Sequence, residues 1–457
     1  MRVSVPHCFQ DHPVTTALIG LSIAWSVSVL VVVGGWLAPS ASDQRNLLYL
    51  VRQSRLIQSF KVDSAQTPPA VWLKRLGPNV ARERWRSSSG DIWWMVWLQD
   101  GAPLLVLQAT DTSEPSRVSA SFPGMELLFA DELHRKSFIS KLPAKGFASS
   151  GLERDCMDRL SGSTAVAWNP SGLSSIAGPL AFAFHSGSYG CVSLNLDRRG
   201  FVLDGSVSSR PLSSAPSSLR RPSETQAVFK TFADLSPPQN QLALHLSGST
   251  TRPLFASLLQ RRLLSDGIEN NYGLTPQLQA EWLMAPMNLE VHLRHKGPFK
   301  AWLQLTLAFQ KQQASDVNKG LASISSVLES RGMRSQLIQT STGPNAAQSS
   351  TLIWMNDQRQ ELGRWSLVPS NQNQFLLQFS LGGPPGLLAS PLKSKPNSGL
   401  MVRFHAKQLT ELGWLKSSWP IQVRQAGQGE LRLRPMLGSK SDHQDTWYWL
   451  EGQLSLR

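Results

Sequence analysis

Short apolar runs separated by turn residues dominate the first part of this chain. Residues 91–99 (DIWWMVWLQ) and 103–109 (PLLVLQA) flank the turn Asp100-Gly101-Ala102. Runs of this length, joined by a short turn with glycine, are typical of a β-hairpin. A second hairpin is predicted from residues 190–196 and 201–209, where apolar residues alternate with smaller or polar ones. This part is therefore predicted to contain β-sheet.

The later part of the chain mixes strand-like alternation with helix-like spacing. Strands are predicted at residues 242–246, 288–294, 301–309, 336–340, 350–355, 364–368, 374–379, 430–434 and 446–455. Helices are predicted at residues 130–142, 252–264, 275–284, 315–331 and 406–415. Strands joined by short turns and interrupted by single helices favour antiparallel sheets that helices cover on one face.

The amino-terminal segment is apolar over a length that fits a membrane. Residues 12–42 contain no Asp, Glu, Lys or Arg, and the apolar centre at 14–36 has 23 residues. At about 1.5 Å per residue a helix of that length covers roughly 34 Å, more than a hydrocarbon core of about 30 Å. A cleaved signal peptide is the alternative, because small residues follow at 38–42. The stretch exceeds the usual signal-peptide core of about 7–15 residues, so a retained transmembrane helix at 14–36, after a tail at 1–13, is favoured.

A further helix is predicted directly after this segment, at residues 43–61. Arg45, Arg52 and Arg55 lie on one stripe of that helix, and its other faces are apolar. Such a helix fits an anionic headgroup layer on either side of a membrane, and it equally fits docking on the folded domain. Taken literally, the excess of positive charge after residues 14–36 favours a cytoplasmic domain, but a helix that fits a headgroup layer on either side does not fix the orientation.

The remaining chain is predicted to form two lobes. A chain of 457 residues exceeds the usual size of one domain. Residues 62–207 form the first predicted α+β lobe, residues 208–224 a Ser/Pro/Arg-rich linker, and residues 225–457 the second α+β lobe. The predicted fold class is α+β, with an N-terminal transmembrane helix and two lobes of mainly antiparallel sheet with covering helices.

Charge and cysteine content narrow the partners. The formal net charge is +14, and it is spread over many loops. No zinc-finger spacing, RNP-like motif or Lys/Arg-rich run accompanies it, so no nucleic acid is expected as a partner. Anionic lipid headgroups, or solubility alone, explain the charge better. Cys156 and Cys191 either form a disulfide in an oxidising compartment or remain two buried thiols, and Cys8 precedes the apolar segment.

The usual motifs of nucleophilic and nucleotide chemistry are missing. The sequence has no G-x-S-x-G, G-x-G-x-x-G, Walker A, H-E-x-x-H or EF-hand motif. Residues 187–190 (GSYG) have the wrong spacing for a nucleophile elbow and fit a turn before a strand. Ser390 and Lys393 match S-x-x-K, but Pro391 places them in a loop rather than at a helix start. An enzyme is disfavoured, and no catalytic or cofactor-binding residue is predicted.

Metal and phosphate binding have only thin support. Glu290 and His292 share a face of a predicted strand, and His295 follows closely. Zinc needs three or four converging donors, so exposed strand residues are the favoured interpretation. The run His134-Arg135-Lys136 could contact phosphate, although such a run on a helix is usually its solvated face. No metal site and no cofactor are predicted.

Several segments together resemble a family of single-span, membrane-anchored cyanobacterial proteins. They are residues 14–36, 287–332 (beginning MNLEVHLRHKGPFKAWLQL), 351–354 and 374–383. The resemblance is one of pattern more than identity, and it brings no catalytic residues. It implies a plasma or thylakoid membrane setting.

These features together predict a membrane-anchored, non-enzymatic basic protein. Its single-pass anchor at 14–36 would contact membrane lipid, and its large C-terminal domain would lie outside the cytoplasm. That domain would bind a protein partner or an amphiphile at the membrane surface. The alternative is a membrane-anchored hydrolase with an unfamiliar active-site motif.

Overall fold

A computed structural model describes residues 41–455, with gaps at 100–101, 109–118, 123, 141–148, 178–186, 198–199, 218, 220–241, 251, 253–261, 295–298, 341–348, 372, 384–398, 416–426 and 438–446. The chain divides into two compact units. Of the described residues, those within 41–177, 187–219 and 436–451 form the first unit. Those within 242–435 and 452–455 form the second.

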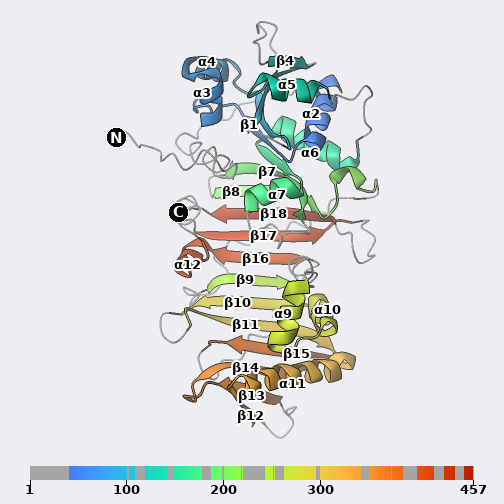
Figure 1. Cartoon of the computed structure of the whole chain (residues 1–457), viewed down its shortest axis with the longest axis vertical. Helices are drawn as coiled ribbons and strands as arrows, with labels where there is room; N and C mark the ends of the chain where they lie inside the picture. The colour runs from blue at the N-terminus through green and yellow to red at the C-terminus, as the bar shows by residue number, and fades with distance from the viewer. Residues whose placement is uncertain are drawn as a thin grey trace, which may run out of the picture. The chain divides into compact units, whose positions relative to one another are not determined.

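The first unit is built on an antiparallel sheet of short strands (Figure 1). In spatial order its strands are β4 (Ser119–Phe122), β5 (Met125–Leu128), β3 (Leu104–Gln108), β2 (Ile92–Trp97), β1 (Leu56–Lys61), β6 (Ala165–Trp168), β7 (Tyr189–Asp197) and β8 (Gly200–Ser208). Both hairpins predicted from the sequence are present, as β2–β3 and β7–β8. Residues 447–451 of β18 (Trp447–Ser455) also belong to this unit.

Helices pack on both faces of this sheet and form an apolar core with each face. They are α2 (Ala41–Gln53), α3 (Ala70–Leu76), α4 (Pro78–Ser87), α5 (Glu132–Ile139), α6 (Gly151–Gly162) and α7 (Pro170–Ala177), with a 3-10 turn at Leu212–Ser214. Every residue of β2 is buried. Trp94 packs in the core that α2, α5 and α6 share, and Trp93 points to the opposite core with α3 and α4. The central strands are therefore buried on both faces, which explains their unbroken apolar sequence.

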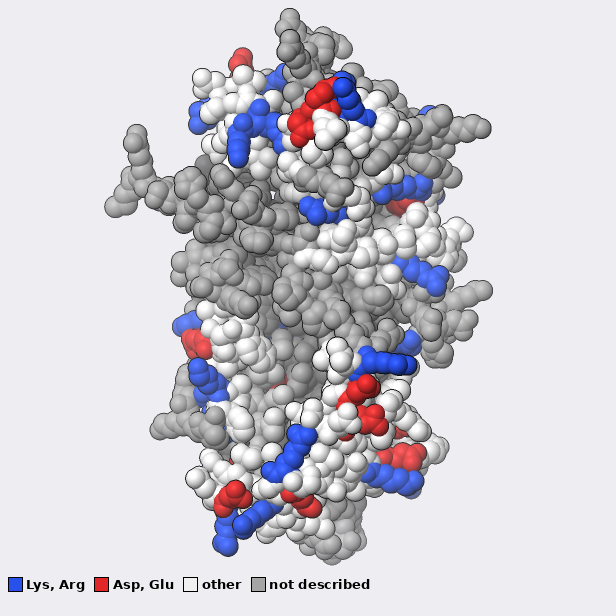
Figure 2. Space-filling view, in the orientation of Figure 1, with Lys and Arg blue, Asp and Glu red and all other residues white. Residues whose placement is uncertain are grey.

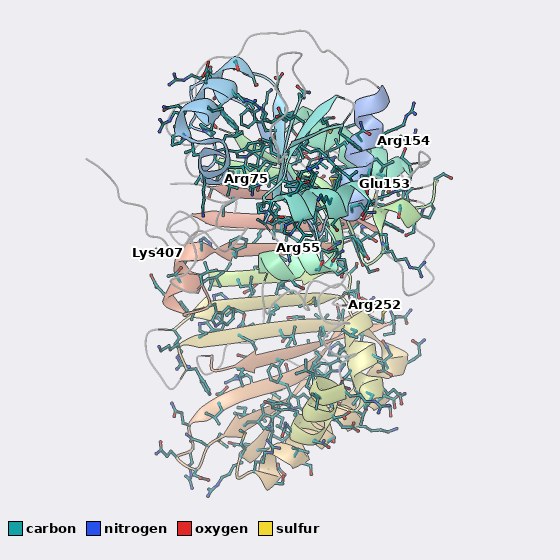
Figure 3. The ribbon with its side chains drawn as sticks, turned by 45° about the horizontal axis from the view of Figure 1, so that its top comes forward. Arg55, Arg75, Glu153, Arg154, Arg252 and Lys407 are labelled. Atoms are coloured by element: carbon teal, nitrogen blue, oxygen red, sulfur yellow. A yellow bond between two sulfur atoms is a disulfide. The ribbon has the colours of Figure 1, made fainter. Side chains whose placement is uncertain are left out.

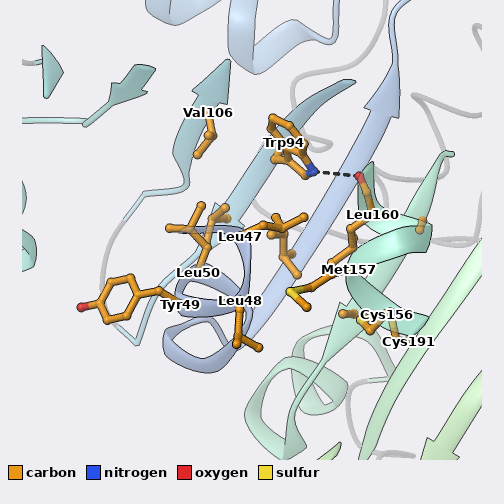
Figure 4. Packing of buried hydrophobic residues seen from close by; sticks show 14 of the residues in the cluster. Leu47, Leu48, Tyr49, Leu50, Trp94, Val106, Cys156, Met157, Leu160 and Cys191 are labelled. Atoms are coloured by element: carbon orange, nitrogen blue, oxygen red, sulfur yellow. Dashed lines mark hydrogen bonds between the residues drawn. A yellow bond between two sulfur atoms is a disulfide. The ribbon is translucent and has the colours of Figure 1, made fainter. Parts of the chain in front are cut away.

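Tryptophan dominates the core beside α3 and α4. The Trp93 ring lies 4.6 Å from the Trp72 ring and 4.8 Å from the Trp85 ring, between centroids. In the other core, the Trp94 indole N–H donates to the Leu160 carbonyl at 2.8 Å (Figure 4). Trp72, Trp85, Trp93 and Trp94 thus serve core packing in this unit.

The residues predicted as one helix at 43–61 form two elements. α2 ends at Gln53, and residues 56–61 form β1 in the middle of the sheet. Leu47, Leu48, Tyr49 and Leu50 are all buried in the first unit, so α2 docks on the fold. The helical prediction ran on to residue 61 because a strand buried on both faces has no period of two to distinguish it from an apolar helix.

An ion pair fixes α2 against α6. The Arg52 guanidinium donates to both carboxylate oxygens of Glu153, at 2.7 and 2.8 Å. Glu153 also accepts from the backbone N–H of Ser150, whose hydroxyl caps α6 by accepting from the Glu153 N–H. Glu153 is 2% exposed, whereas Arg154 beside it is exposed (Figure 3). Of the arginines predicted to face lipid headgroups, Arg52 thus forms an ion pair within the fold.

A disulfide joins Cys156 of α6 to Cys191 of β7. Both cysteines are fully buried in the core that contains Leu160 and Met157 (Figure 4). The bond ties a covering helix to the sheet across 35 residues of sequence. Of the two alternatives that the sequence left, the structure has the disulfide.

The second unit contains a larger antiparallel sheet. In spatial order its strands are β12 (Arg334–Thr340), β13 (Ser349–Met355), β14 (Glu361–Asn371), β15 (Gln374–Leu381), β11 (Ala301–Gln310), β10 (Met287–Leu293), β9 (Leu242–Gly248), β16 (Leu400–His405) and β17 (Gln428–Pro435). Its helices are α9 (Arg262–Tyr272), α10 (Pro276–Met284), α11 (Ala314–Ser330) and α12 (Ala406–Glu411), with a 3-10 turn at Lys311–Gln313. Val317, Leu321 and Ile324 of α11 pack on one face of the sheet with Met287 and Leu307.

The α+β fold class and the transmembrane character predicted from the sequence are corrected by this structure. Among the described residues antiparallel sheet predominates and the helices are few, because short strands that the sequence analysis did not predict, such as β1, β5 and β6, add to the sheet. Within the described residues, no helix has the length and apolarity needed to cross a bilayer. Residues 1–13 and 14–36 lie outside the part of the chain that the structure describes.

Candidate binding surfaces

Polar side chains occupy the face of the second unit's sheet that points away from α11. Strand register places Asn288 beside Thr306, Thr306 beside Gln378, and Gln378 beside Ser366. A second row of neighbouring side chains crosses the strands beside the first. It consists of Arg403, His245, Glu290, Gln304, Ser380 and Arg364. Thr306, Gln378 and Ser366 are buried. This face therefore carries buried polar groups, which usually have hydrogen-bond partners in a folded protein.

A chain of hydrogen bonds crosses β9 and β10 on this face. The His245 Nε2 atom lies 2.6 Å from the Asn288 Oδ1 atom, and the Asn288 amide N–H donates to Glu290 at 3.3 Å. His292 Nε2 lies 3.1 Å from the other carboxylate oxygen of Glu290. The hydrogen bond from His292 lowers the pKa of the Glu290 carboxyl, and burial lowers the pKa of His245. Glu290 is thus charged at neutral pH, and His245 is neutral.

The candidate metal residues are only partly brought together. Glu290 and His292 are bonded to each other, and the His292 ring stacks on Trp302 with centroids 4.0 Å apart. His295 lies outside the described residues. In the described ranges, no three His, Cys, Asp or Glu side chains are placed to hold a metal ion. The Nε2 atoms of His245 and His292 are taken by Asn288 and Glu290, so this geometry fixes the strands rather than a metal ion or a nucleophile.

Ion pairs extend this layer onto the neighbouring strands. Glu430, 2% exposed, accepts from Arg403 at 2.8 Å and also from Arg432. Arg364 donates two bonds of 2.6 Å to Glu361. Sequence reasoning missed His245, Asn288, Arg403 and Glu430 because only the register of distant strands brings them together. Their one local signal is a polar residue at alternate strand positions.

The other residues singled out from the sequence have local roles. Asp131 caps α5 by accepting from the His134 N–H at 2.9 Å, and its carboxylate also meets the His134 ring. Arg135 pairs with Glu132 of the same helix. Ser390 and Lys393 lie outside the described residues. On the face shown in Figure 2, acidic and basic side chains of the described residues lie interspersed, as expected of a solvated surface.

Gly190, from the sequence GSYG, has a packing role. It lies in β7 opposite Trp168 of β6, whose indole N–H donates to the Gly187 carbonyl at 2.8 Å. A Cβ atom on Gly190 would lie 2.3 Å from the Trp168 ring. Only glycine lets the ring pack this closely on the strand.

A second candidate surface is the free edge of β12. Among the described strands, β12 pairs with β13 alone, without a shift in register (Figure 1). Alternate residues of an edge strand direct their backbone N–H and C=O groups away from the sheet. Leu337 and Ile338, consecutive and thus on opposite faces of β12, are 57% and 37% exposed. The edge therefore offers backbone donors and acceptors beside apolar side chains on both faces.

Comparisons with protein-family models, with curated proteins and with solved structures find no match for this chain. The resemblance to the cyanobacterial membrane-anchored family stays a prediction. The functional argument accordingly rests on the geometry of the polar layer and of β12.

Proposed function

We propose that this protein is a non-enzymatic binding protein whose second unit accepts an extended strand of a protein partner along β12. The free edge of β12, with Leu337 and Ile338 exposed beside it, carries the proposal. A strand added to a sheet edge gains main-chain hydrogen bonds, and the alternate side chains supply specificity.

The residues of β12 itself have none of the sequence features that usually prevent such pairing. Natural sheets protect an edge with Pro, Lys, a bulge or a very short strand. β12 (RSQLIQT) has neither Pro nor Lys, spans seven residues, and its only charged residue is Arg334 at its first position. By contrast β4, which pairs only with β5 among the described strands, has four residues. An edge left unprotected over seven residues favours a binding role.

A protein partner fits better than the amphiphile that the sequence also suggested. A hollow of about 590 Å³ in the first unit is lined by Asn79, Arg82, Glu83, Arg86 and Ser87, all of α4. The residues that line it are all polar or charged, so this hollow offers an amphiphile's tail no apolar residue. The edge of β12, in contrast, is suited only to an extended polypeptide.

The proposed location is outside the cytoplasm, beside a plasma or thylakoid membrane. The Cys156–Cys191 disulfide supports this, because such bonds persist in oxidising compartments and are rare in the cytosol. Thiol labelling of denatured protein from intact cells tests it. Free thiols at both cysteines would argue for the cytoplasm.

A displayed library of ten-residue peptides, selected on the full chain, tests the binding role. We expect enriched peptides with alternating apolar residues, and we expect them to slow amide exchange in β12. Leu337→Lys should abolish their binding, because a lysine at an edge opposes strand addition. The matched control is Leu263→Lys in α9, where the leucine is 90% exposed and away from the edge. Peptides that bind both variants equally would rule out the proposed site.

A further inference from the structure

We infer that the strand taken up by β12 is β12 of a second copy of this chain, paired antiparallel about a two-fold axis at Leu337. This inference rests on the proposed function and names its partner. In an isologous pair both copies use the same surface. If one residue contacts a second residue of the other copy, the reverse contact also forms, so the surface must be complementary to itself.

The position of Leu337 makes β12 self-complementary. The strand runs from Arg334 to Thr340, and Leu337 is its midpoint. Full overlap of two antiparallel copies therefore sets Leu337 opposite Leu337 of the second copy. On the other face of the strand, Ile338 then lies opposite Gln336 of the second copy. The most exposed apolar side chain of the edge is thus covered by its own copy.

The charges of β12 are compatible with this pairing. Arg334 is its only charged residue, so the strand offers no acidic group that would select a basic partner. Two-fold pairing places the two Arg334 residues at opposite ends, six strand positions apart. At about 3.4 Å per position that is roughly 20 Å, beyond the Debye length of about 8 Å at physiological salt. Like charges therefore do not meet along the paired strands.

The contact is small, so the dimer should dissociate on dilution. A seven-residue strand is about 24 Å long, and one strand pair buries less than the roughly 1,200 Å² of a standard interface. The chain also carries a net charge of +14, which opposes self-association at low salt. A homodimer should therefore strengthen as salt is raised, whereas an acidic peptide partner would bind more weakly.

Sedimentation of the full chain with Cys8→Ser, in detergent-containing buffer at low and high salt, tests the inference. We expect a concentration-dependent dimer whose dimer fraction at fixed concentration rises with salt. Leu337→Lys should make it monomeric throughout, and Leu263→Lys should leave it unchanged. In the same background, Leu337→Cys should give a covalent dimer on oxidation, whereas Leu263→Cys, at the exposed control position, should not.

The outcomes separate this inference from the proposed function. A chain that stays monomeric at the highest concentration, yet still binds displayed peptides in a Leu337-dependent way, overturns the homodimer and keeps the binding edge. A dimer that Leu337→Lys does not weaken also overturns the inference. If the unmodified chain neither dimerises nor binds displayed peptides, the proposed function is overturned as well.

Discussion

The two units use the same antiparallel sheet in different ways. In the first unit β2 is buried on both faces, between two separate cores, and a disulfide ties α6 to β7. In the second unit one face of the sheet is apolar, the other carries polar side chains with a hydrogen-bonded cluster around Glu290, and β12 pairs with β13 alone among the described strands. The comparison teaches that the first unit encloses its central strands, whereas the second leaves the outer backbone groups of β12 unpaired by any described strand, as the proposed binding role requires.

The largest predicted effect is on the first unit. Trp94→Ala removes a side chain that is 2% exposed and its bond to the Leu160 carbonyl. We expect about 3–5 kcal/mol of destabilisation from the cavity and the unpaired carbonyl. Denaturant unfolding followed with two independent probes would measure this change in the free energy of unfolding. Loss of less than about 1 kcal/mol would show that this core collapses around the gap, contrary to tight packing on both faces.

The disulfide should rank next. Replacing both Cys156 and Cys191 by Ala removes a cross-link between residues 35 positions apart. In the chain-entropy model this lowers the free energy of unfolding by about 3–4 kcal/mol. Thermal unfolding of the double variant, beside the reduced natural chain, would check it. Equal melting of oxidised and reduced chains would contradict the role assigned to this bond.

Breaking the ion pair of α2 comes third. Arg52→Ala removes two hydrogen bonds from the buried Glu153 carboxylate and leaves it the bond from the Ser150 N–H. Removing one partner of a buried pair is costly, and since Arg52 is partly exposed we expect about 2 kcal/mol. Arg154→Ala on the same helix is the control, because Arg154 is exposed and should change stability by less than about 0.5 kcal/mol. Proteolysis between α2 and β1 should rise in the first variant only.

The smallest predicted effect is a loss of stability of the second unit at acid pH. The folded-state pKa values of Glu290 and His245 are both lowered, so each contributes stability above its ordinary pKa that is lost as pH falls through the folded pKa. For His245 that loss begins below about pH 6.5, and for Glu290 below about pH 4.3. In the first unit burial raises the pKa of Asp91, which works in the opposite direction.

The measurement for this prediction is unfolding between pH 7 and pH 3. Glu290→Gln should flatten the pH dependence of the second unit by about 1 kcal/mol, because the neutral amide does not titrate. His292→Gln should act in the same direction through the lost hydrogen bond. An unchanged profile in both variants would mean that this layer does not control acid stability.

The sequence predicted elements well where the pattern was regular. Residues 301–309 and 315–331 closely match β11 (Ala301–Gln310) and α11 (Ala314–Ser330), because one face of each is apolar. β1 was missed because both of its faces are buried, so its residues have no period of two. Sheet register lies beyond local pattern, and it alone brings His245 to Glu290 and leaves β12 at the edge. The shared face of Glu290 and His292 could be predicted, but their hydrogen-bonded partners could not.

Amide hydrogen exchange of the full chain over a range of concentrations tests the difference between the two units most directly. We predict that β2 amides are strongly protected at every concentration, since β2 pairs on both sides and is buried. In β12, alternate amides should exchange fast in dilute protein and become protected as concentration rises. Uniform strong protection of β12 at the lowest concentration would show that its edge is already covered, and would contradict the binding role of the second unit.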